Sequence, residues 1–275
     1  MYYLETNSIR IFNKNLSTPF YLSNCYTSIL SICELLAGIK DEKSFRERKG
    51  IIRMIYFSRI LSDNDLPETK KYKAFGLSVN SNVSDGIALL GALCIASESY
   101  QEFQDQIPKH LLTEYWDFLK VYDNVDTKFK ESYKMRQEAF DYSDSNMAKD
   151  FNKRWDNLDK NPELKSSILN DLIVYFAKSI LEDKVVNTEG KSLYNLVQSY
   201  DHSLDIFFLC IGYFTGTKLI FRNAPSRNDY LDMAHLMYLS NPKSIIVSND
   251  RMIRKVLMKI NPNNFLSADE FECIT

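Results

Sequence analysis

Two segments decide the fold: residues 228–236, with the sequence NDYLDMAHL, and residues 243–250, with the sequence KSIIVSND. The first predicts an amphipathic helix with acidic residues in its first turn, and the second predicts a short buried strand that ends at an acid. Asp229 and Asp232 are three residues apart, so they share one helix face. Ligands of open α/β sheets bind beyond the carboxyl ends of the strands, where Asp250 is expected. Three carboxylates converging there suggest a site for a hard divalent cation.

The composition indicates a helix-rich globular protein. The chain has 275 residues, is 45% hydrophobic and contains only eight glycines and seven prolines. This length allows one large or two small domains with a sizeable core, and the shortage of glycine and proline favours helices over tight turns. The formal net charge is −2, so there is no overall basic field and any contact with nucleic acid needs a local patch.

Cysteine usage and hydropathy predict a soluble cytoplasmic protein that does not bind a membrane. No cysteine pair has the spacing of a zinc site, and an odd, scattered set fits a reducing compartment. No secretory signal peptide is visible, and the longest apolar run is far too short to span a bilayer. The five cysteines are at positions 25, 33, 94, 210 and 273.

The predicted strands lie at the two ends of the chain and a helical block lies between them. Residues 2–4 predict a strand, and a loop signal at 62–67 precedes the block. Residues 218–221 fit either a helix continuation or a short strand, and 268–271 a terminal turn. The predicted helices are 24–38, 42–61, 84–100, 108–121, 126–142, 145–158, 163–182, 190–214 and 251–260, and a last strand is predicted at 264–266. This order divides the chain into a first α/β half (1–61), a helical insertion or lobe (62–205) and a second α/β half (206–275).

Four motifs in chain order carry a resemblance to a known family. They are LETN at 4–7, SILSICELL at 28–36, the acidic helix at 228–236 and IVSND at 246–250. The chain resembles PIN-domain nucleases, in which a first strand ends in Asp-Thr-Asn, an early helix carries a glutamate, a later helix starts with an aspartate, and a strand is followed by Thr-x-Asp. Residues 264–271 also resemble the last strand and helix of that family. The match covers about 1–60 and 215–272, and it departs from the family at Glu5, which replaces an aspartate, and at Ser248, which replaces a threonine.

The resemblance implies a fold and an activity. The expected fold is a PIN-like three-layer α/β/α core with a mainly parallel sheet, interrupted by the helical insertion. The expected activity is that of a metal-dependent endoribonuclease that uses Mg²⁺ or Mn²⁺, in a toxin or defence context. Phosphodiester hydrolysis needs charge neutralisation on the phosphate and a deprotonated water, and a hard cation held by carboxylates supplies both.

The acidic residues are assigned to this cation. Glu5, Asp229 and Asp250 are the expected metal ligands, and Glu34 is a ligand through water or an acid that positions the base. Asp232 is either a fourth ligand or the true counterpart of the family's helix aspartate, and its spacing leaves this open. Each acid also has a structural alternative: a solvated strand end for Glu5, an ion pair with Arg53 for Glu34, a favourable helix N-terminus for Asp229, a buried hydrogen-bonded acid for Asp232 and a helix cap for Asp250.

Three further residues are placed beside the acids. Asn7 and Ser248 are expected to orient the carboxylates, although Asn7 also fits an ordinary turn. His235 lies one helical step from Asp232, which it could orient, and a core histidine with both ring nitrogens satisfied is the favoured interpretation.

Arginines that flank the acidic motifs are the expected nucleic-acid contacts. They are Arg46, Arg53, Arg227, Arg251 and Arg254, and basic side chains of this kind bind phosphates. Solvated charged faces are the alternative for all of them. RNA is expected rather than DNA, as a tendency of the family, and the helical lobe is expected to cover the site or to bind a protein partner or a second copy. Two other interpretations stay open: a non-catalytic PIN-like scaffold, and an all-helical interaction protein.

Overall fold

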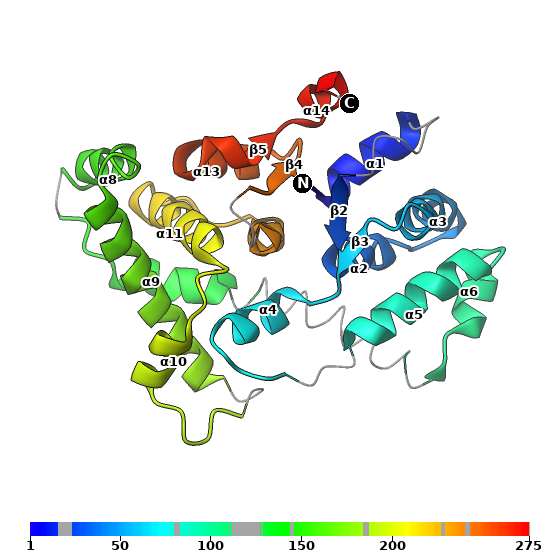
Figure 1. Cartoon of the computed structure of the whole chain (residues 1–275), viewed down its shortest axis with the longest axis horizontal. Coiled ribbons are helices and arrows are strands. Elements are labelled where there is room, and N and C mark those ends of the chain that lie inside the picture. The colour runs from blue at the N-terminus through cyan, green and yellow to red at the C-terminus, as the bar shows by residue number, and fades with distance from the viewer. Residues whose placement is uncertain are drawn as a thin grey trace.

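The protein is an α/β structure built on a parallel sheet (Figure 1). The computed structural model describes residues 1–15, 24–79, 83–109, 111, 127, 129–143, 146–183, 187–226, 229–239 and 243–274. Within these ranges every strand pair is parallel, which confirms the predicted α/β class with a parallel sheet. The strand order is β3-β2-β1-β4-β5, formed by Leu61–Asp63, Cys25–Ser28, Tyr2–Leu4, Ile245–Val247 and Phe265–Leu266.

Alternate residues of the strands enter two different cores. Tyr3 and Ile246 face a core that contains α11 (Asp205–Ile220), η2 (His235–Tyr238) and α13 (Arg251–Ile260). Leu4 and Val247 face a second core that contains α1 (Thr6–Asn15), α2 (Ile29–Ala37) and α3 (Glu42–Phe57). Because successive strand side chains point to opposite faces, helices cover both faces of the sheet, and its central strand β1 is almost fully buried.

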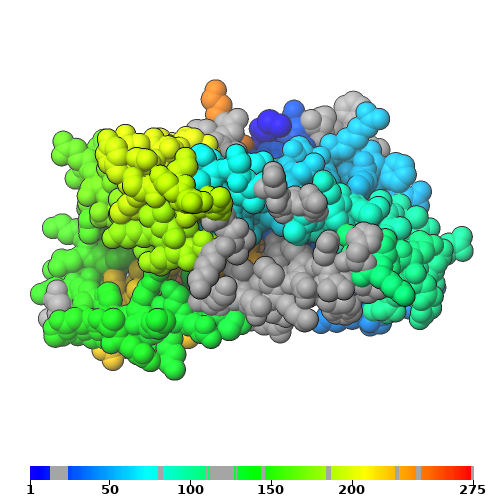
Figure 2. All heavy atoms as spheres, turned by 90° about the horizontal axis from the view of Figure 1, so that it is seen from below, coloured from blue at the N-terminus to red at the C-terminus, as the bar shows by residue number. Residues whose placement is uncertain are grey.

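The helices between the two α/β segments contribute to both cores. α5 (Val83–Ala96) and α6 (Tyr100–Gln106) pack with α2 and α3. The other helices join the core around α11, and α4 lies between α10 and α5 on the face seen in Figure 2. They are α4 (Pro67–Ala74), α8 (Met147–Asp156), α9 (Pro162–Glu182) and α10 (Leu193–Ser199). The division of the chain at 61/62 and 205/206 stays a prediction, and strand β3 spans the first of these boundaries.

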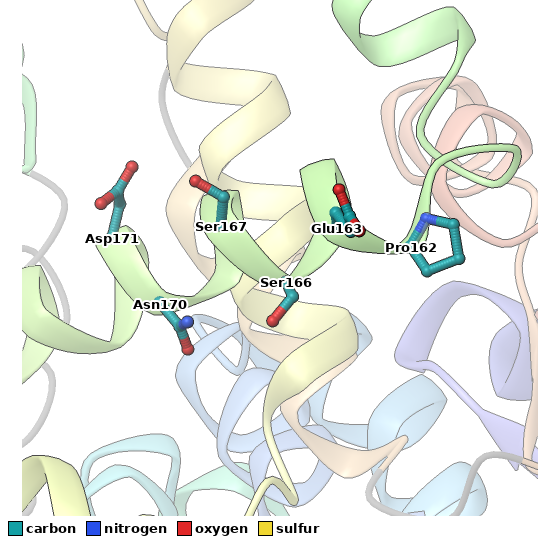
Figure 3. A pocket seen from close by; sticks show the side chains of 6 residues that line it. All are labelled: Pro162, Glu163, Ser166, Ser167, Asn170 and Asp171. Carbon is teal, nitrogen blue, oxygen red and sulfur yellow. The ribbon is translucent and has the colours of Figure 1, made fainter.

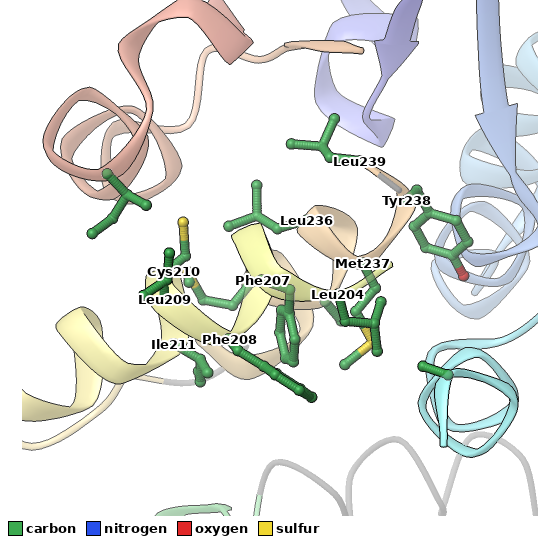
Figure 4. Close-up of a cluster of buried hydrophobic side chains, with 14 of the residues drawn as sticks. Leu204, Phe207, Phe208, Leu209, Cys210, Ile211, Leu236, Met237, Tyr238 and Leu239 are labelled. Atoms are coloured by element: carbon green, nitrogen blue, oxygen red, sulfur yellow. The ribbon is translucent and has the colours of Figure 1, made fainter. Parts of the chain in front are cut away.

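Side chains of α11 and of the short helices before β4 form the centre of the larger core (Figure 4). Phe207 and Phe208 project from α11 beside Leu236 and Met237 of η2. α12 (Asp229–Ala234) runs directly into η2. This packing anchors the acidic helix and therefore fixes the direction in which its polar side chains point.

Two predicted helices near the start of the chain are wrong in part. The segment 24–38 begins as strand β2 and becomes helical only at Ile29. β2 is buried at all four positions, so its sequence has no alternation between polar and apolar residues that would distinguish it from a helix. The helix predicted at 42–61 ends at Phe57, and part of the predicted loop at 62–67 pairs with β2 as strand β3.

The single helix predicted at 190–214 is two helices, α10 and α11. The helical conformation is interrupted between Ser199 and Asp205. In this segment His202 has a φ of 63°, and the amide of Asp201 donates to the carbonyl of Ala74 at 3.0 Å. Residues 218–220 continue α11 rather than forming a strand. Residues 129–139 are helical, inside the predicted helix 126–142, while most of the helix predicted at 108–121 lies outside the described residues.

A glycine closes helix α2. Gly38 is the C-cap, and the guanidinium of Arg48 lies where a Cβ would project from this glycine. Arg48 Nη1 donates to the carbonyls of Glu34 and Leu35 at 3.3 Å each, so it adds a second donor to carbonyls that also accept from the amide of Gly38. The close approach therefore needs a glycine, and it fixes the helix that carries Glu34.

None of the described helices combines the length and the apolar character that crossing a bilayer would require.

Candidate functional site

Four acidic side chains gather beyond the carboxyl ends of the central strands. Glu5 directly follows β1, and Asp250 follows β4 by three residues. Glu34 lies on α2, which directly follows β2, and Asp232 lies on α12. Asp250, Glu34 and Glu5 each raise the pKa of Asp232, and Glu34 also raises the pKa of Glu5, so the four form one electrostatic group, here called the acidic cluster: Glu5, Glu34, Asp232 and Asp250.

Glu5 caps the first helix of the chain. Its Oε2 accepts a hydrogen bond from the amide of Asn7 at 2.8 Å, and its Oε1 accepts from the amide of Ser8 at 3.1 Å. The hydroxyls of Ser8 and Ser248 also donate to Oε1, at 3.4 and 3.2 Å. Burial raises the pKa of Glu5, while the charge of His235 and the Asn7 amide act in the opposite direction. The side chain is buried, not the solvated strand end considered above, and most of its acceptor capacity is already used.

Glu34 is held by two donors on a single oxygen. Thr6 Oγ1 donates to Glu34 Oε2, and His235 Nε2 lies 3.2 Å from the same atom. Burial alone would raise the pKa of this carboxyl, but His235, Thr6 and Arg48 together lower it. No described residue donates a hydrogen bond to Oε1. Arg53, the alternative partner, instead lies over the ring of Phe57 with its Cζ 5.3 Å from the centroid.

Asp250 has both a capping role and a free oxygen. Its Oδ1 accepts from the amides of Met252 and Ile253 at 2.8 Å each, which makes it the N-cap of α13. The capping alternative is thus correct for one oxygen. Oδ2 receives no hydrogen bond from any residue that the structure describes, so it remains available at the carboxyl edge of the sheet.

Asp232 has a carboxyl group to which no described residue donates a hydrogen bond. Its pKa is raised from 3.8 to about 7, first by burial and then by the charges of Asp250, Glu34 and Glu5, against which His235 acts. Carboxylates that share a site without a compensating cation disfavour one another's ionisation. Asp232 is therefore the member of the acidic cluster with the greatest need for a positive partner.

Asp229 is bound elsewhere, three residues before Asp232. Its Oδ2 accepts from the amide of Ser226 at 2.8 Å and lies 3.2 Å from Lys218 Nζ, and the Ser226 hydroxyl donates to Oδ1. Asp229 is absent from the causes that shift the pKa values of Glu5, Glu34 and Asp232. The structure brings Asp232 to the acidic cluster and ties Asp229 to the loop before its helix.

His235 pairs with Glu34 and not with the neighbouring Asp232. Its imidazole is 1% exposed, and its Nδ1 lies 2.7 Å from the hydroxyl of Tyr3. Burial lowers the pKa of this imidazole, but the charges of Glu34, Glu5 and Asp232 and the hydrogen bond to Glu34 raise it further than burial lowers it. The favoured expectation of a core histidine with both ring nitrogens satisfied is confirmed, and one of the two partners belongs to the acidic cluster.

The two predicted orienting residues differ in how they contact the acids. Ser248 is fully buried; its hydroxyl donates to Glu5 and accepts from the amide of Asp250 at 2.9 Å. Asn7 contacts Glu5 through its backbone amide. The sequence interpretation did not assign Thr6, which binds Glu34, although its place directly after Glu5 at a strand end was a usable signal.

The predicted phosphate contacts are mostly exposed. Arg251 and Arg254 project from the first turns of α13, directly after Asp250. Arg46 Nε lies 2.6 Å from Glu42 Oε1, so its charge is partly compensated on its own helix. Arg227 lies outside the described residues. Of the described arginines, the pair on α13 is therefore nearest in sequence to the acidic cluster.

No closed metal site is visible among the described residues. No three His, Cys, Asp or Glu side chains in the described ranges are arranged so that they could hold one ion. A surface hollow of about 680 Å³ is lined entirely by residues of the first turns of α9 (Figure 3). They are Pro162, Glu163, Ser166, Ser167, Asn170 and Asp171. A hollow along one helix presents no convergent polar groups from other elements, so the acidic cluster is the stronger candidate site.

The raised pKa of Asp232 predicts how the Asp232→Asn variant will change stability with pH. The folded protein holds the Asp232 proton up to about pH 7, whereas the unfolded chain releases it near the ordinary aspartate value, so wild-type protein loses stability as the pH rises between these two values. Asparagine cannot ionise. The variant should therefore gain free energy of unfolding over wild type at pH 8, by a few kcal/mol at most, and little at pH 4.

Urea unfolding at both pH values, with no divalent cation added, measures this gain. The Asp229→Asn variant is the control, because Asp229 is paired with Lys218 and should lose stability at pH 8. An equal effect of Asp232→Asn at pH 4 and pH 8 would contradict the raised pKa.

No protein-family model, no characterised protein and no solved structure matches this chain.

Proposed function

We propose that this protein is a metal-dependent, PIN-like nuclease that hydrolyses phosphodiester bonds in RNA. One observation carries the proposal: the half-buried carboxyl of Asp232 has no hydrogen-bond donor among the described residues, and the charges of Asp250, Glu34 and Glu5 raise its pKa. Such a group is stabilised by a cation. It is also found at the carboxyl edge of a parallel sheet, which is where α/β proteins bind ligands.

The donor set fits Mg²⁺ or Mn²⁺ in its chemistry. Asp232, Oδ2 of Asp250 and Oε1 of Glu34 offer carboxylate oxygens that accept no hydrogen bond from the described residues. Hard divalent cations take oxygen ligands and complete their coordination with water. We therefore assign the ligand role to Asp232, Asp250 and Glu34, which would have to move closer together or bind through water, since no three such side chains of the described residues are placed to hold one ion.

The other two acids predicted as ligands take different roles in this proposal. Glu5 already accepts four hydrogen bonds, so we assign it to holding the start of α1 and the Ser248 hydroxyl beside the site. Asp229 stabilises the loop before α12 through Ser226 and Lys218. The metal ligand on the acidic helix is then Asp232, which the spacing of the sequence had left undecided.

The residues around the cluster prepare it for a phosphate. A bound divalent cation neutralises phosphate charge and lowers the pKa of a coordinated water. Thr6 and His235 hold Glu34 ionised and leave its second oxygen free, and the amides of α13 hold Asp250 in one orientation. Arg251 and Arg254 supply positive charge beyond Asp250, where they would contact the phosphates on either side of the scissile bond.

The proposal also includes a cytoplasmic location and a toxin or defence role. All five cysteines are free thiols, and four of them are buried, which suits a reducing cytoplasm. A toxin or defence setting, and a protein partner or second copy bound through the helices of 62–205, remain parts of this proposal that need their own tests.

The proposed activity predicts cleavage of labelled RNA in the presence of Mn²⁺ or Mg²⁺ and no cleavage after chelation with EDTA. Single-stranded DNA of the same sequence measures the preference for RNA. Asp250→Asn is the matched negative control, because an asparagine oxygen still caps α13 while the ligand charge is lost. Cleavage that persists in EDTA, or that survives in Asp250→Asn, would contradict the proposal.

A non-catalytic scaffold is the second candidate. It is favoured by the saturated carboxyl of Glu5 and by the absence of a closed metal site among the described residues. The scaffold predicts no cleavage of either polymer and no saturable binding of Mn²⁺, so the same samples separate the two functions.

A further inference from the structure

A chain of buried hydroxyl and imidazole groups runs behind the acidic cluster. The hydroxyl of Tyr3 lies 2.8 Å from Ser28 Oγ and 2.7 Å from His235 Nδ1, and His235 Nε2 lies 3.2 Å from Glu34 Oε2. Tyr3, Ser28 and His235 are each at most 1% exposed. No water is therefore needed to complete the path from β1 to Glu34.

The chemistry of the groups limits which of them can donate and which can accept along this path. The ionised carboxylate of Glu34 only accepts hydrogen bonds, so Nε2 of His235 must carry a hydrogen toward it. In the neutral ring Nδ1 is then an acceptor, and the Tyr3 hydroxyl donates to it while the Ser28 hydroxyl donates to Tyr3. When the ring is charged, Nδ1 donates to Tyr3, which donates to Ser28. In both arrangements the N–H at Nε2 donates to Glu34, because each hydroxyl group can act either as donor or as acceptor.

Aromatic packing holds the tyrosine in place. The Tyr3 ring stacks on Tyr238, with centroids 5.4 Å apart and an interplanar angle of 12°, and contacts Tyr26 at 5.3 Å. Tyr3 belongs to the central strand, whose register fixes its backbone against β2 and β4. The hydroxyl is thus presented to His235 from the central strand of the sheet.

We propose that Tyr3 and His235 are positioning residues that orient Glu34 for cation binding in the acidic cluster. This inference rests on the proposed metal-dependent function. His235 binds Oε2 of Glu34 and leaves Oε1 without a donor among the described residues, and Tyr3 fixes the plane of the imidazole. Groups that hold a ligand in this way typically change metal affinity by about 10- to 100-fold when they are removed.

The Tyr3→Phe variant tests the chain, because it removes the hydroxyl and keeps the ring stack. Tyr26→Phe is the matched control: Tyr26 is buried in the same core, and its hydroxyl donates to the carbonyl of Tyr238 at 2.8 Å without contacting His235. Thermal unfolding of both variants shows whether each one folds. If Tyr3→Phe fails to fold, His235→Gln replaces it, since glutamine can present an amide hydrogen to Glu34 but no Nδ1 acceptor to Tyr3.

The first readout is independent of metal and activity. The sequence contains only three histidines, so ¹⁵N-histidine NMR resolves them, and His235→Gln identifies the His235 signals. Wild type and Tyr26→Phe should show a protected imidazole N–H at Nε2. In Tyr3→Phe this signal should broaden or exchange rapidly, because the ring is no longer fixed. An equally protected Nε2 hydrogen in Tyr3→Phe and Tyr26→Phe would overturn the inference.

The second readout is Mn²⁺ affinity measured by calorimetry at constant pH. Tyr3→Phe should bind Mn²⁺ about 10- to 100-fold more weakly than wild type, and Tyr26→Phe should bind like wild type. Unchanged affinity in folded Tyr3→Phe also overturns the inference. If wild type shows the protected hydrogen but binds no Mn²⁺, the proposed function fails, and that outcome differs from failure of the hydrogen-bond chain.

Discussion

Asp232→Asn is expected to lower the rate of Mn²⁺-dependent RNA cleavage by at least about 100-fold, since a catalytic cation contributes several kcal/mol and each 1.36 kcal/mol is tenfold in rate. The substitution preserves the size of the side chain and removes only the charge of a carboxyl that no described residue binds. Initial rates with labelled RNA at saturating Mn²⁺ and pH 8 measure the effect, because Asp232 is ionised at that pH.

Asp229→Asn is the control for this experiment. It makes the same chemical change three residues earlier on the same helix, and its oxygen can still accept from Ser226. We expect its cleavage rate to stay close to that of wild type, with a loss of stability from the broken pair with Lys218. A loss of activity in Asp229→Asn with normal activity in Asp232→Asn would reverse the assignment of the helix acid.

Phe208→Ala is expected to destabilise the protein by about 3–5 kcal/mol, which is the usual cost of truncating a fully buried phenylalanine. Phe208 is 0% exposed and stacks on Phe176 of α9 with centroids 4.3 Å apart and an interplanar angle of 7°. It also contacts Tyr200 at 5.4 Å and Phe75 at 6.2 Å. One ring thus connects α11 to α9 and to the end of α4.

Urea unfolding at pH 7 measures this loss, with Tyr194→Ala as the control. Tyr194 is 71% exposed on α10, and surface substitutions usually change stability by no more than about 0.5 kcal/mol. If Phe208→Ala behaves like Tyr194→Ala, α11 does not form a common core with the helices that precede it. Wild-type protein should unfold in a single cooperative transition, because the helices share their cores with the sheet.

The parallel sheet could be predicted because β1 and β4 are bounded by recognisable motifs. β2 could not be distinguished from the helix that follows it, since all four residues of Cys25–Ser28 are buried and no glycine or proline separates them from α2. The interruption between α10 and α11 could not be predicted from the local sequence either. It depends on a contact between Asp201 and Ala74, which are distant in the sequence.

The acids of the site were predictable from their places at strand ends, but their hydrogen-bond partners were not. Helical spacing puts Asp229 and Asp232 on one face, yet Asp229 is the first residue of α12 and turns back to bind Ser226. Its partner Lys218 lies on α11. The pairing of His235 with Glu34 joins residues 201 positions apart, and no local pattern in the sequence encodes a contact of that kind.

Glu5 caps helix α1 in the structure, whereas the sequence motif predicted a metal ligand at this position. Its carboxylate turns back to the amides of Asn7 and Ser8, as that of Asp250 does to the amides of Met252 and Ile253. This capping role uses most of the acceptor capacity of Glu5. It shifts the expected ligand set toward Asp232, Asp250 and Glu34 and leaves Glu5 as a cap for α1.

The central claim is that Asp232 and Asp250 hold a divalent cation, and a crystal structure with Mn²⁺ tests it most directly. Anomalous diffraction should locate a Mn²⁺ ion with oxygens of both aspartates at about 2.0–2.6 Å, the range of carboxylate distances for hard divalent cations, and with Glu34 bound directly or through water. Crystals at the same Mn²⁺ concentration that show no anomalous peak at the acidic cluster, or a peak at Asp229 instead, would contradict the claim.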